Sequence, residues 1–593
     1  MNTTVAAAGD TAYVRRMAGG WGHRLRQLSP FEATAWMVGF SLMALASYPL
    51  LKVLVRLFWV DGSLTLEPIK ATLDQPDLWS LMYNTIVVVL ASGVLALIGG
   101  SVLAWLNERT NARMGAFTDS LPLVPFLLPP VAGAIGWVLL TSPGAGYLNV
   151  VLRNVFGWFG VEMTKGPLDI YSWYGLIFVF VVYQVPFVFL LMSAGLRTMD
   201  TGLEEQSRVC GASWFRTMRS VTLPALMPSI GGAVLLMAWQ GFAIFSLPAI
   251  VGGPANIELL SVRIVRVLSY TYPPETDVAV GLSAIVVMFV GVTWYLQSRM
   301  LRSNRFATIG GKGESGGVSE LGRWRLPVRL VMLSYVLVAA VLPIGALLLV
   351  SLSGFWTASV PWGDLSFATM RETVFDDPLT VRSLSNSLRL GVSGATIGMV
   401  AAALIAVVIV RSRSKVGRIV DAGIKMPASI SNIVLAVGFL LAFAGPPFNL
   451  RGTFLILLLG YIALYLPQGS VAADTAAGQV DDQLAEASFV SGARKGRTFW
   501  KIQLPLMIPG LVAGWALLFA RMTGDLTASA LLSGTRNPVV GFRILDVYQN
   551  GSYAEVASLA TVLVVITGTV VTVLMTWARR KSRWGTSVGV GGL

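Results

Sequence analysis

The chain has only one cysteine, Cys210, and one histidine, His23, in 593 residues. A single cysteine cannot form an intrachain disulfide, and two such residues cannot build a cluster of sulfur and imidazole metal ligands. Charged residues are also scarce, at 12% of the chain, whereas soluble globular proteins have about 25%. These absences exclude a disulfide scaffold and a His/Cys metal centre. We expect no bound metal, and no constellation of catalytic residues is present.

Apolar residues make up 55% of the chain. They occur in runs long enough to cross, as helices, a bilayer core of about 30 Å. We therefore predict an all-α polytopic membrane protein with about twelve transmembrane helices. The expected spans lie near residues 34–58, 82–106, 121–141, 171–194, 224–250, 277–297, 327–352, 385–410, 424–444, 453–473, 506–526 and 555–578.

The net charge of +14 follows the membrane topology. Basic residues cluster in the segments that lie inside if the N-terminus is cytoplasmic, as the positive-inside rule requires. Those segments are 107–120, 196–223, 298–326, 411–423, 474–505 and 579–593. Residues 1–32 are polar and basic, which favours a cytoplasmic N-terminal extension over a cleaved signal peptide. No nucleic-acid-binding motif accompanies the charge, so we expect a lipid bilayer and no nucleic acid as partner.

The two halves of the chain repeat each other. Asn84, Gly115, Pro125 and Gly136 match Asn386, Gly417, Pro427 and Gly438 at an offset of 302, and Pro186, Glu205, Gly211, Pro224, Pro228, Gly253 and Asn256 match Pro467, Glu486, Gly492, Pro505, Pro509, Gly534 and Asn537 at an offset of 281. Six spans per copy give both copies the same orientation. We predict a first repeat at 33–297, a cytoplasmic linker at 298–326, a second repeat at 327–578 and a cytoplasmic tail at 579–593.

A polar loop between the fourth and fifth spans occurs in both copies. The second copy, 481–505, contains "EASFVSGARKGRTFWKIQLP", and the first copy, 201–224, contains "EQSRVCGASWFRTMRSVTLP". We expect an acidic N-cap at Asp481 or Asp482, a short helix, a glycine elbow, a second short helix, and a proline that begins the next span. A single loop of this kind could be a solvated basic loop, but two matched copies favour a conserved docking knob.

The second loop resembles the EAA loop of ABC-type importer permeases, on Glu486-Ala487-Ser488, Gly492 and Leu504-Pro505. The first loop departs from the pattern at Gln206 and Val221. The two-copy arrangement resembles the fused ferric-iron-type permeases and implies a type I importer fold in a bacterial inner membrane. In that family each EAA loop couples to a separate ATP-binding subunit. The residues implied in coupling are Glu205, Gly211, Phe215, Pro224, Glu486, Gly492, Phe499 and Pro505.

ATP hydrolysis must come from another chain, because the sequence has no P-loop of the form GxxxxGK[ST]. The chain is therefore expected to be a transport subunit and no enzyme itself. The resemblance places ATP and magnesium on two partner ATPase subunits. It also implies one extracytoplasmic solute-binding protein.

The predicted translocation path is lined by polar residues within the spans. We name Tyr183, Gln184, Gln240, Tyr465, Arg521 and Asp525. Arg521 and Asp525 are expected four residues apart on one helix, where their charges would offset each other. Prolines in the same spans free backbone carbonyls that can line a polar path, although they could also only kink helices for packing.

Two segments, 247–265 and 528–545, resemble the paired outer gate segments of iron-type permeases. Each contains a Gly-x-x-Asn sequence, Gly253 to Asn256 and Gly534 to Asn537. Glycine permits a sharp turn and asparagine can close it with its side chain. We predict that both segments turn back toward the pseudo-twofold axis, seal the outer mouth and contact the binding protein.

The expected function is that of an ATP-driven importer permease carrying ferric iron or a similar small solute. Without outer His or Cys, any metal would meet oxygen ligands, which suits hard Fe(III). Polyamine, thiamine, phosphonate and sulfate importers share this architecture and remain alternatives. An ion-coupled carrier with two six-helix halves is a further alternative, but such a carrier should keep more ionisable groups in its spans.

Overall fold

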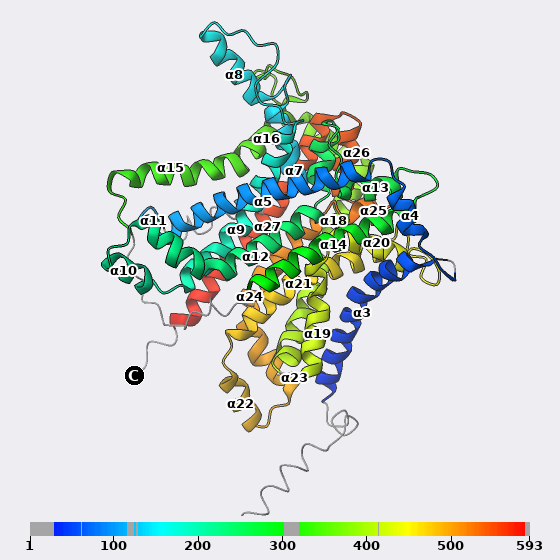
Figure 1. Cartoon of the computed structure of the whole chain (residues 1–593). Coiled ribbons are helices and arrows are strands. Elements are labelled where there is room, and N and C mark those ends of the chain that lie inside the picture. The colour runs from blue at the N-terminus through cyan, green and yellow to red at the C-terminus, as the bar shows by residue number, and fades with distance from the viewer. Residues whose placement is uncertain are drawn as a thin grey trace, which may run out of the picture.

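A computed structural model of the chain describes residues 29–60, 62–114, 124–125, 128–301, 319–412 and 414–587 (Figure 1). Short π-helical or 3-10 turns are labelled η. The first half contains α3 (Pro30–Phe58), β1 (Trp59–Val60), β2 (Ser63–Leu64), α4 (Glu67–Leu73), α5 (Leu78–Arg109), α7 (Pro130–Thr141), α8 (Tyr147–Trp158), α9 (Trp173–Thr198), α10 (Gly202–Val209), α11 (Trp214–Thr217), η2 (Met218–Thr222), α12 (Leu223–Ala243), η3 (Pro248–Gly252), α13 (Leu260–Ser269) and α14 (Thr276–Leu301).

The second half has the same order of long helices, without described counterparts of the β1–β2 hairpin and α8. It contains η5 (Gly322–Trp324), α15 (Arg325–Val336), η6 (Leu337–Val341), α16 (Leu342–Ser353), α17 (Ala368–Arg371), η7 (Glu372–Asp376), α18 (Pro378–Ile405), η8 (Ala406–Val410), α19 (Lys415–Lys425), η9 (Met426–Ser429), α20 (Asn432–Phe443), α21 (Phe454–Gly478), α22 (Asp482–Val490), α23 (Lys495–Thr498), η10 (Phe499–Gln503), α24 (Leu504–Thr523), α25 (Ser529–Leu532), α26 (Val540–Gln549) and α27 (Tyr553–Ser587). Strands β1 and β2 form a small antiparallel hairpin after α3.

The all-α polytopic fold is confirmed. Ten helices in the described part of the chain are long and apolar enough to cross a membrane, and the number rises to eleven if one bent pair counts as a span. They coincide with ten of the twelve expected spans; the exceptions are the third span of each half. In the first half α7 has 12 residues, and the beginning of the expected span lies outside the described residues.

The ninth expected span, near 424–444, is not one continuous helix. The helix pair α19–η9 and α20 is bent by 111°. Pro427 lies in η9 and supplies no N–H to a helical ladder, and Ile430 then takes an extended conformation with φ −125° and ψ 141°. The chain therefore turns before α20 begins.

Three of the long helices contain a π-helical turn directly before a Leu-Pro pair. The turns η2, η6 and η10 end one residue before Leu223-Pro224, Leu342-Pro343 and Leu504-Pro505. Proline in a helix lacks an N–H and clashes with the carbonyl four residues earlier. A π turn accommodates the missing bond and lets the helix continue. The two EAA loops therefore pass without a break into the fifth span of each half, over Trp214–Ala243 and Lys495–Thr523.

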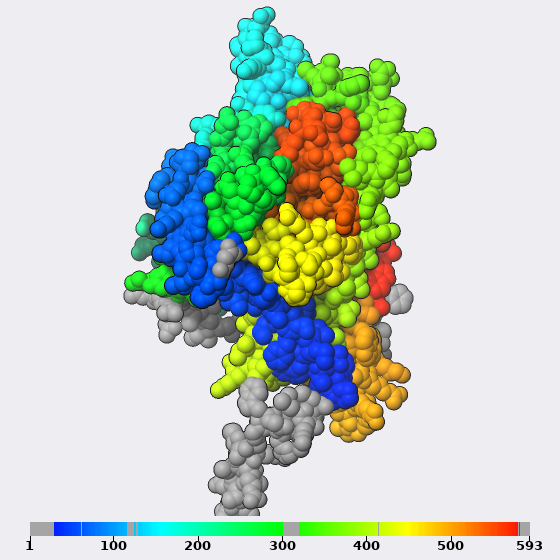
Figure 2. Space-filling view, turned by 90° about the vertical axis from the view of Figure 1, so that its right-hand side faces the viewer, coloured from blue at the N-terminus to red at the C-terminus, as the bar shows by residue number. Residues whose placement is uncertain are grey.

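The first helix of each half packs on the other half. Helix α3 lies against α19 and α20, and α16 lies against α7. Figure 2 shows α3 (blue) beside helices of the second half (yellow and yellow-green). The crossings are close at matched glycines: a Cβ on Gly438 would lie 2.6 Å from the carbonyl oxygen of Pro49, and one on Gly136 would lie 2.7 Å from that of Pro343. Only glycine permits this approach, so Gly136 and Gly438 allow the first helix of each half to pack on the other half. We call this arrangement the exchange of α3 and α16.

Candidate functional site: EAA loops, central pocket and outer gate

Both EAA loops have the expected short helix followed by a glycine elbow. Helices α10 and α22 end just before Gly211 and Gly492, whose φ angles are +81° and +82°. Asp481 caps α22, because its side chain accepts a hydrogen bond from the N–H of Gln483 at 3.0 Å. The elbows therefore have a left-handed backbone that glycine adopts readily.

A hydroxyl pair closes each elbow. Ser207 lies 3.0 Å from Thr217, and Ser488 lies 2.9 Å from Thr498, measured between the hydroxyl oxygens. Both threonines were missed from the sequence, although the offset of 281 residues relates them as well. The pairs tie the short helix before the elbow to the helix after it, so each loop is a defined knob.

The structure places the coupling residues unequally. Glu205 and Glu486 lie on exposed faces of α10 and α22. Phe215 is 66% exposed, whereas its counterpart Phe499 is only 2% exposed. Pro224 and Pro505 stand in the first turns of α12 and α24, as expected. A π turn joins each of these helices to the loop before it.

Phe499, which the resemblance implied in coupling, is buried within the permease. Its ring packs on the ring of Phe31 at a centroid distance of 5.2 Å, and Phe31 belongs to the first turn of α3. Lys495 adds an ion pair with Glu32 of the same turn, at 2.5 Å. The beginning of α3 therefore covers part of the second EAA loop, whereas Trp500 and Phe489 of the same loop remain exposed, at 57% and 42%.

Five of the six predicted path residues line one central pocket of about 60 Å³. They come from both halves: Tyr183 from α9, Gln240 from α12, Tyr465 from α21, Arg521 from α24 and Asp525 from the turn after α24. The sequence repeat thus brought together residues that are far apart along the chain. The sixth, Gln184, is wrong as a lining residue: it is buried, and its Nε2 lies 3.5 Å from the Ser92 hydroxyl of α5.

The charged residues of the pocket are held by tyrosines of opposite halves. Arg521 donates to the Tyr183 hydroxyl at 2.6 Å, and the Tyr465 hydroxyl donates to Asp525 at 2.7 Å. The expectation that Arg521 and Asp525 share one helix is wrong, because α24 ends at Thr523. Asp525 instead accepts the N–H of Ala528 at 2.9 Å. The carboxylate is thereby fixed at the pocket wall.

A larger cavity of about 490 Å³ adjoins the central pocket. The two share Gln240, Gln468 and Arg521. Along α24 the larger cavity reaches Leu517, toward the EAA loop, whereas the pocket reaches Gly524 at the opposite end of the helix. The larger cavity therefore lies on the side of the pocket that faces the EAA loops, which is the cytoplasmic side. Gln468 was not predicted from the sequence.

Both Gly-x-x-Asn segments form turns, but the backbone N–H of each asparagine closes the turn, and the side chain does not do so as predicted. The N–H of Asn256 bonds the carbonyl of Gly253 at 3.1 Å, and that of Asn537 bonds the carbonyl of Gly534 at 2.9 Å. The left-handed residue in the first turn is Asn256, with φ +55°. In the second turn, glycine matters for close approach, since a Cβ on Gly534 would lie 3.1 Å from the Cα of Gly452.

The two segments meet each other across the halves. The Tyr548 hydroxyl of α26 bonds the carbonyl of Ile250 in η3 at 3.1 Å, and the Ser269 hydroxyl of α13 bonds the carbonyl of Ala530 in α25 at 3.3 Å. Both η3 and α25 are buried. They lie at the end of the pocket opposite the larger cavity, which is where an outer seal is expected.

Matched side chains of the second span of each half hold these segments. Asn84 bonds the carbonyl of Glu258 at 3.1 Å, and Asn386 bonds that of Pro538 at 3.0 Å. The next residue in each copy carries a hydroxyl group that accepts a hydrogen bond from the start of the gate helix. Thr85 accepts from the N–H of Leu260 in α13, and Ser387 accepts from the N–H of Val540 in α26. Both asparagines belong to the repeat at an offset of 302 residues, but their sequence context did not predict this role.

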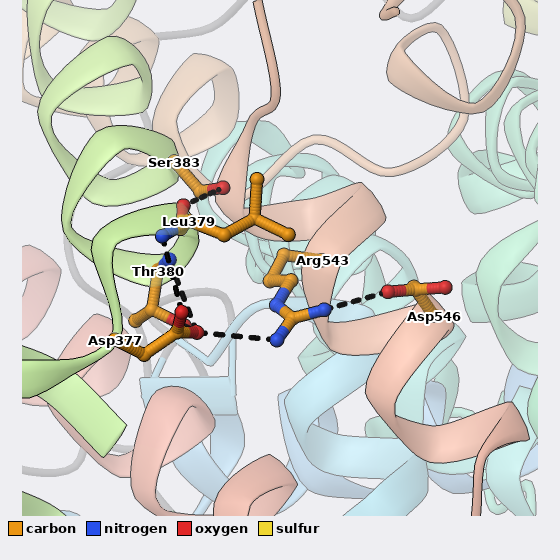
Figure 3. A network of polar contacts seen from close by, with 6 residues as sticks. All are labelled: Asp377, Leu379, Thr380, Ser383, Arg543 and Asp546. Atoms are coloured by element: carbon orange, nitrogen blue, oxygen red, sulfur yellow. Dashed lines mark hydrogen bonds and ion pairs between the residues drawn. The ribbon is translucent and has the colours of Figure 1, made fainter. Parts of the chain in front are cut away.

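An arginine on each gate helix adds an ionic clamp. Arg263 pairs with Glu258 at 2.8 Å, and Arg543 lies between Asp377 at 3.1 Å and Asp546 at 2.7 Å (Figure 3). Burial raises the pKa of the Asp377 carboxyl, but hydrogen bonds from Thr380 and the N–H of Leu379, together with the charge of Arg543, outweigh burial and hold it below its ordinary value. The Asp377 carboxyl is therefore ionised at neutral pH.

No group of three or more His, Cys, Asp or Glu residues in the described ranges could hold a metal ion. The pocket offers two phenol hydroxyls, one carboxylate and one guanidinium instead. These groups can contact a polar or charged solute briefly, which suits a path better than a tight resident site.

Comparisons with known proteins agree with this architecture. A ferric transport system permease protein FbpB of Actinobacillus pleuropneumoniae is 22% identical over 88% of this chain and 74% of its own length. An Fe(3+)-transport system permease protein FbpB 2 of Haemophilus influenzae is 23% identical over 89% of this chain and 95% of its own length. A spermidine/putrescine transport system permease protein PotC of the same species is 27% identical over 33% of this chain and 75% of its own length.

The family model described as "Binding-protein-dependent transport system inner membrane component" matches this chain twice, at residues 96–299 and 394–584. Each match covers an EAA loop, the path residues of its half and its gate segment. The helices α3 and α16, which exchange between the halves, lie outside both matches. The chain therefore belongs to the inner membrane components of binding-protein-dependent transport systems, as a fused two-copy ABC importer permease of the cytoplasmic membrane.

Proposed function

We propose that this permease carries ferric iron, delivered from outside by a solute-binding protein and released into the cytoplasm. The observation that carries the proposal is the convergence of oxygen-bearing side chains from both halves on one pocket. Hard Fe(III) prefers oxygen ligands such as carboxylate and phenolate. The two long relatives named for ferric transport support the same substrate.

The pocket is suited to transit. It combines one carboxylate, Asp525, with the Tyr183 and Tyr465 hydroxyls, and all three are already engaged in hydrogen bonds. An ion that displaced these bonds would gain only a few ligands, so it could leave again toward the larger cavity. Conduction requires such weak binding.

The energy would come from two ATPase subunits bound to the EAA loops. The loops present Trp214, Phe215 and Trp500 to the cytoplasm, and short helices with aromatic anchors can bind in grooves of a partner. ATP and magnesium would be held by those subunits. The binding protein would contact the gate segments on the opposite side. Family membership sets the ion-coupled carrier aside.

The test is reconstitution of the permease in liposomes with ATPase subunits and a binding protein. We expect ATP-dependent uptake of radioactive iron presented as ferric ion on the binding protein. Spermidine, thiamine, sulfate and a phosphonate serve as competing substrates. Uptake of one of these in place of iron would overturn the substrate, and uptake at full rate without ATPase subunits would overturn the coupling.

A matched pair of variants tests the pocket itself. Tyr465→Phe removes the hydroxyl that bonds Asp525, and we expect iron uptake to fall while ATPase assembly is retained. Tyr335→Phe is the control, because it removes a hydroxyl that donates to the Val182 carbonyl at 3.3 Å and Tyr335 does not line the pocket. Equal loss in both variants would show that the effect is structural.

A further inference from the structure

An arm between α7 and α9 distinguishes the first half from the second. Residues 142–172 form α8 and an irregular return segment, whereas only residues 444–453 join α20 to α21. We call residues 142–172 the outer arm. Figures 1 and 2 both show it (cyan) projecting beyond the neighbouring helices.

The arm lies on the outer side of the membrane. It ends at α9, a 26-residue helix whose other end leads into the first EAA loop. A helix of this length spans about 39 Å, enough to cross the bilayer core. Since the EAA loops are cytoplasmic, the beginning of α9 and the whole arm are extracytoplasmic.

The base of the arm is fixed by one buried asparagine. Asn149 is fully buried, its Nδ2 donates to the carbonyls of Ser142 at 2.9 Å and Leu168 at 2.7 Å, and its Oδ1 accepts the N–H of Leu168 at 3.0 Å. A Cβ on Gly166 would lie 2.1 Å from the Asn149 Cγ. The side chain of Arg153 donates to carbonyls on both sides of the arm, at 2.9 and 3.2 Å. These bonds make the arm a defined structure.

The tip of the arm is aromatic and uncovered by the described chain. Trp158 is 83% exposed and Phe159 is 78% exposed. Trp is the residue type most enriched among the anchors that dominate protein interfaces. A large apolar pair held out on a rigid base therefore points to a binding partner.

The return segment favours a protein partner over the lipid core. Residues 161–172 have no regular hydrogen-bonded structure, and Glu162, Lys165 and Asp169 in this stretch are exposed. Irregular backbone is not tolerated where it faces hydrocarbon. The arm is thus directed to the aqueous outer phase, where the family's solute-binding protein acts.

We propose that the outer arm is a docking site for the extracytoplasmic binding protein, with Trp158 and Phe159 entering an apolar depression on that protein. This inference rests on the proposed function. It also has a consequence for orientation, because the gate segments occur as a matched pair, one in each half, whereas the arm occurs once. The binding protein can therefore dock in one orientation only, with a fixed part of its surface over the first half.

The test measures the affinity of the permease–ATPase complex, held in lipid nanodiscs, for the binding protein that supports uptake by the wild-type complex. Trp158→Ala should weaken binding about tenfold or more, as expected for a central aromatic anchor. Trp79→Ala is the control, because Trp79 is 75% exposed at the outer end of α5 but lies off the arm; its affinity should match the wild type. Because the Trp158 side chain is exposed, the variant should unfold at the wild-type temperature.

A photocrosslinking residue at position 158 separates the outcomes. Attachment to the binding protein supports the proposal, whereas attachment to lipid, with unchanged affinity in Trp158→Ala, overturns it and assigns the arm to the membrane surface. If the wild-type complex binds no solute-binding protein at all, the proposed function fails instead. If wild type and Trp158→Ala bind equally well, the function stands and the arm is not the docking site.

Discussion

Replacing Gly492 by valine should weaken attachment of an ATPase subunit to the second EAA loop. Gly492 has a φ of +82°, and no described heavy atom lies within 4 Å of the position a Cβ would take. The change therefore adds backbone strain without a steric clash. A non-glycine residue in this left-handed conformation costs about 1–2 kcal/mol, so the docking-competent elbow should be populated about 5- to 30-fold less.

Two matched variants isolate the backbone as the cause. Asparagine adopts the left-handed conformation more readily than valine, so Gly492→Asn should lose much less affinity than Gly492→Val. Gly496→Ala changes a glycine of the same loop where the added Cβ would lie 3.5 Å from Phe31, an ordinary contact. Gly496 lies within α23, and alanine favours a helix, so this variant should bind as the wild type does.

The assay titrates purified ATPase subunits onto each permease variant in nanodiscs and follows both the dissociation constant and the stimulated ATPase rate. The first EAA loop is intact in all of them and serves as an internal reference. The reasoning is refuted if Gly492→Asn is as damaging as Gly492→Val. It is refuted equally if Gly496→Ala has the same effect, because bulk in the loop would then matter more than φ.

Three further outcomes follow from the contacts described above. Phe31→Ala should destabilise the second EAA loop by roughly 1–3 kcal/mol in thermal unfolding, less than a fully buried phenylalanine, because Phe31 is half-buried where it covers Phe499. Lys495→Ala should change stability by less than about 1 kcal/mol, because its ion pair is partly exposed; similar effects of the two changes would contradict this division. Arg543→Gln should increase labelling of a cysteine at Thr535 by an impermeant thiol reagent, because it removes the clamp on the gate helix, and unchanged labelling would argue against a gate.

The repeat was the most informative feature of the sequence. It aligned Gln240 with Arg521 and placed Tyr183 and Tyr465 on equivalent helices, and the structure brings all four to one pocket. Equivalent positions of the two repeats are separated by a constant number of residues. The residues that line the pocket could therefore be predicted from the sequence before the helix packing was known. The hydroxyl pairs at the elbows carry the same signal, because Ser207 and Thr217 are related to Ser488 and Thr498 by the offset of 281 residues.

The features that the sequence did not predict depend on contacts between residues that are far apart in the sequence. Hydrophobicity places Phe499 on the apolar side of a short helix, but only the arrival of Phe31, from the other end of the sequence, determines that it is buried. The bend before α20 is a similar case. Pro427 permits a straight or a bent span, and the packing of α3 on Gly438 favours the bent one.

Because α3 and α16 each pack on the opposite half, the parts of this transporter that move together differ from its two sequence repeats. Helix α3 is linked to the second EAA loop at its cytoplasmic end and lies along α19 and α20. It should therefore travel with the second half as one rigid body, although it is encoded in the first. Any inward-to-outward rotation must then strain the connection from α3 to α4 and α5, so residues 59–77 are where the hinge of the first half is to be sought.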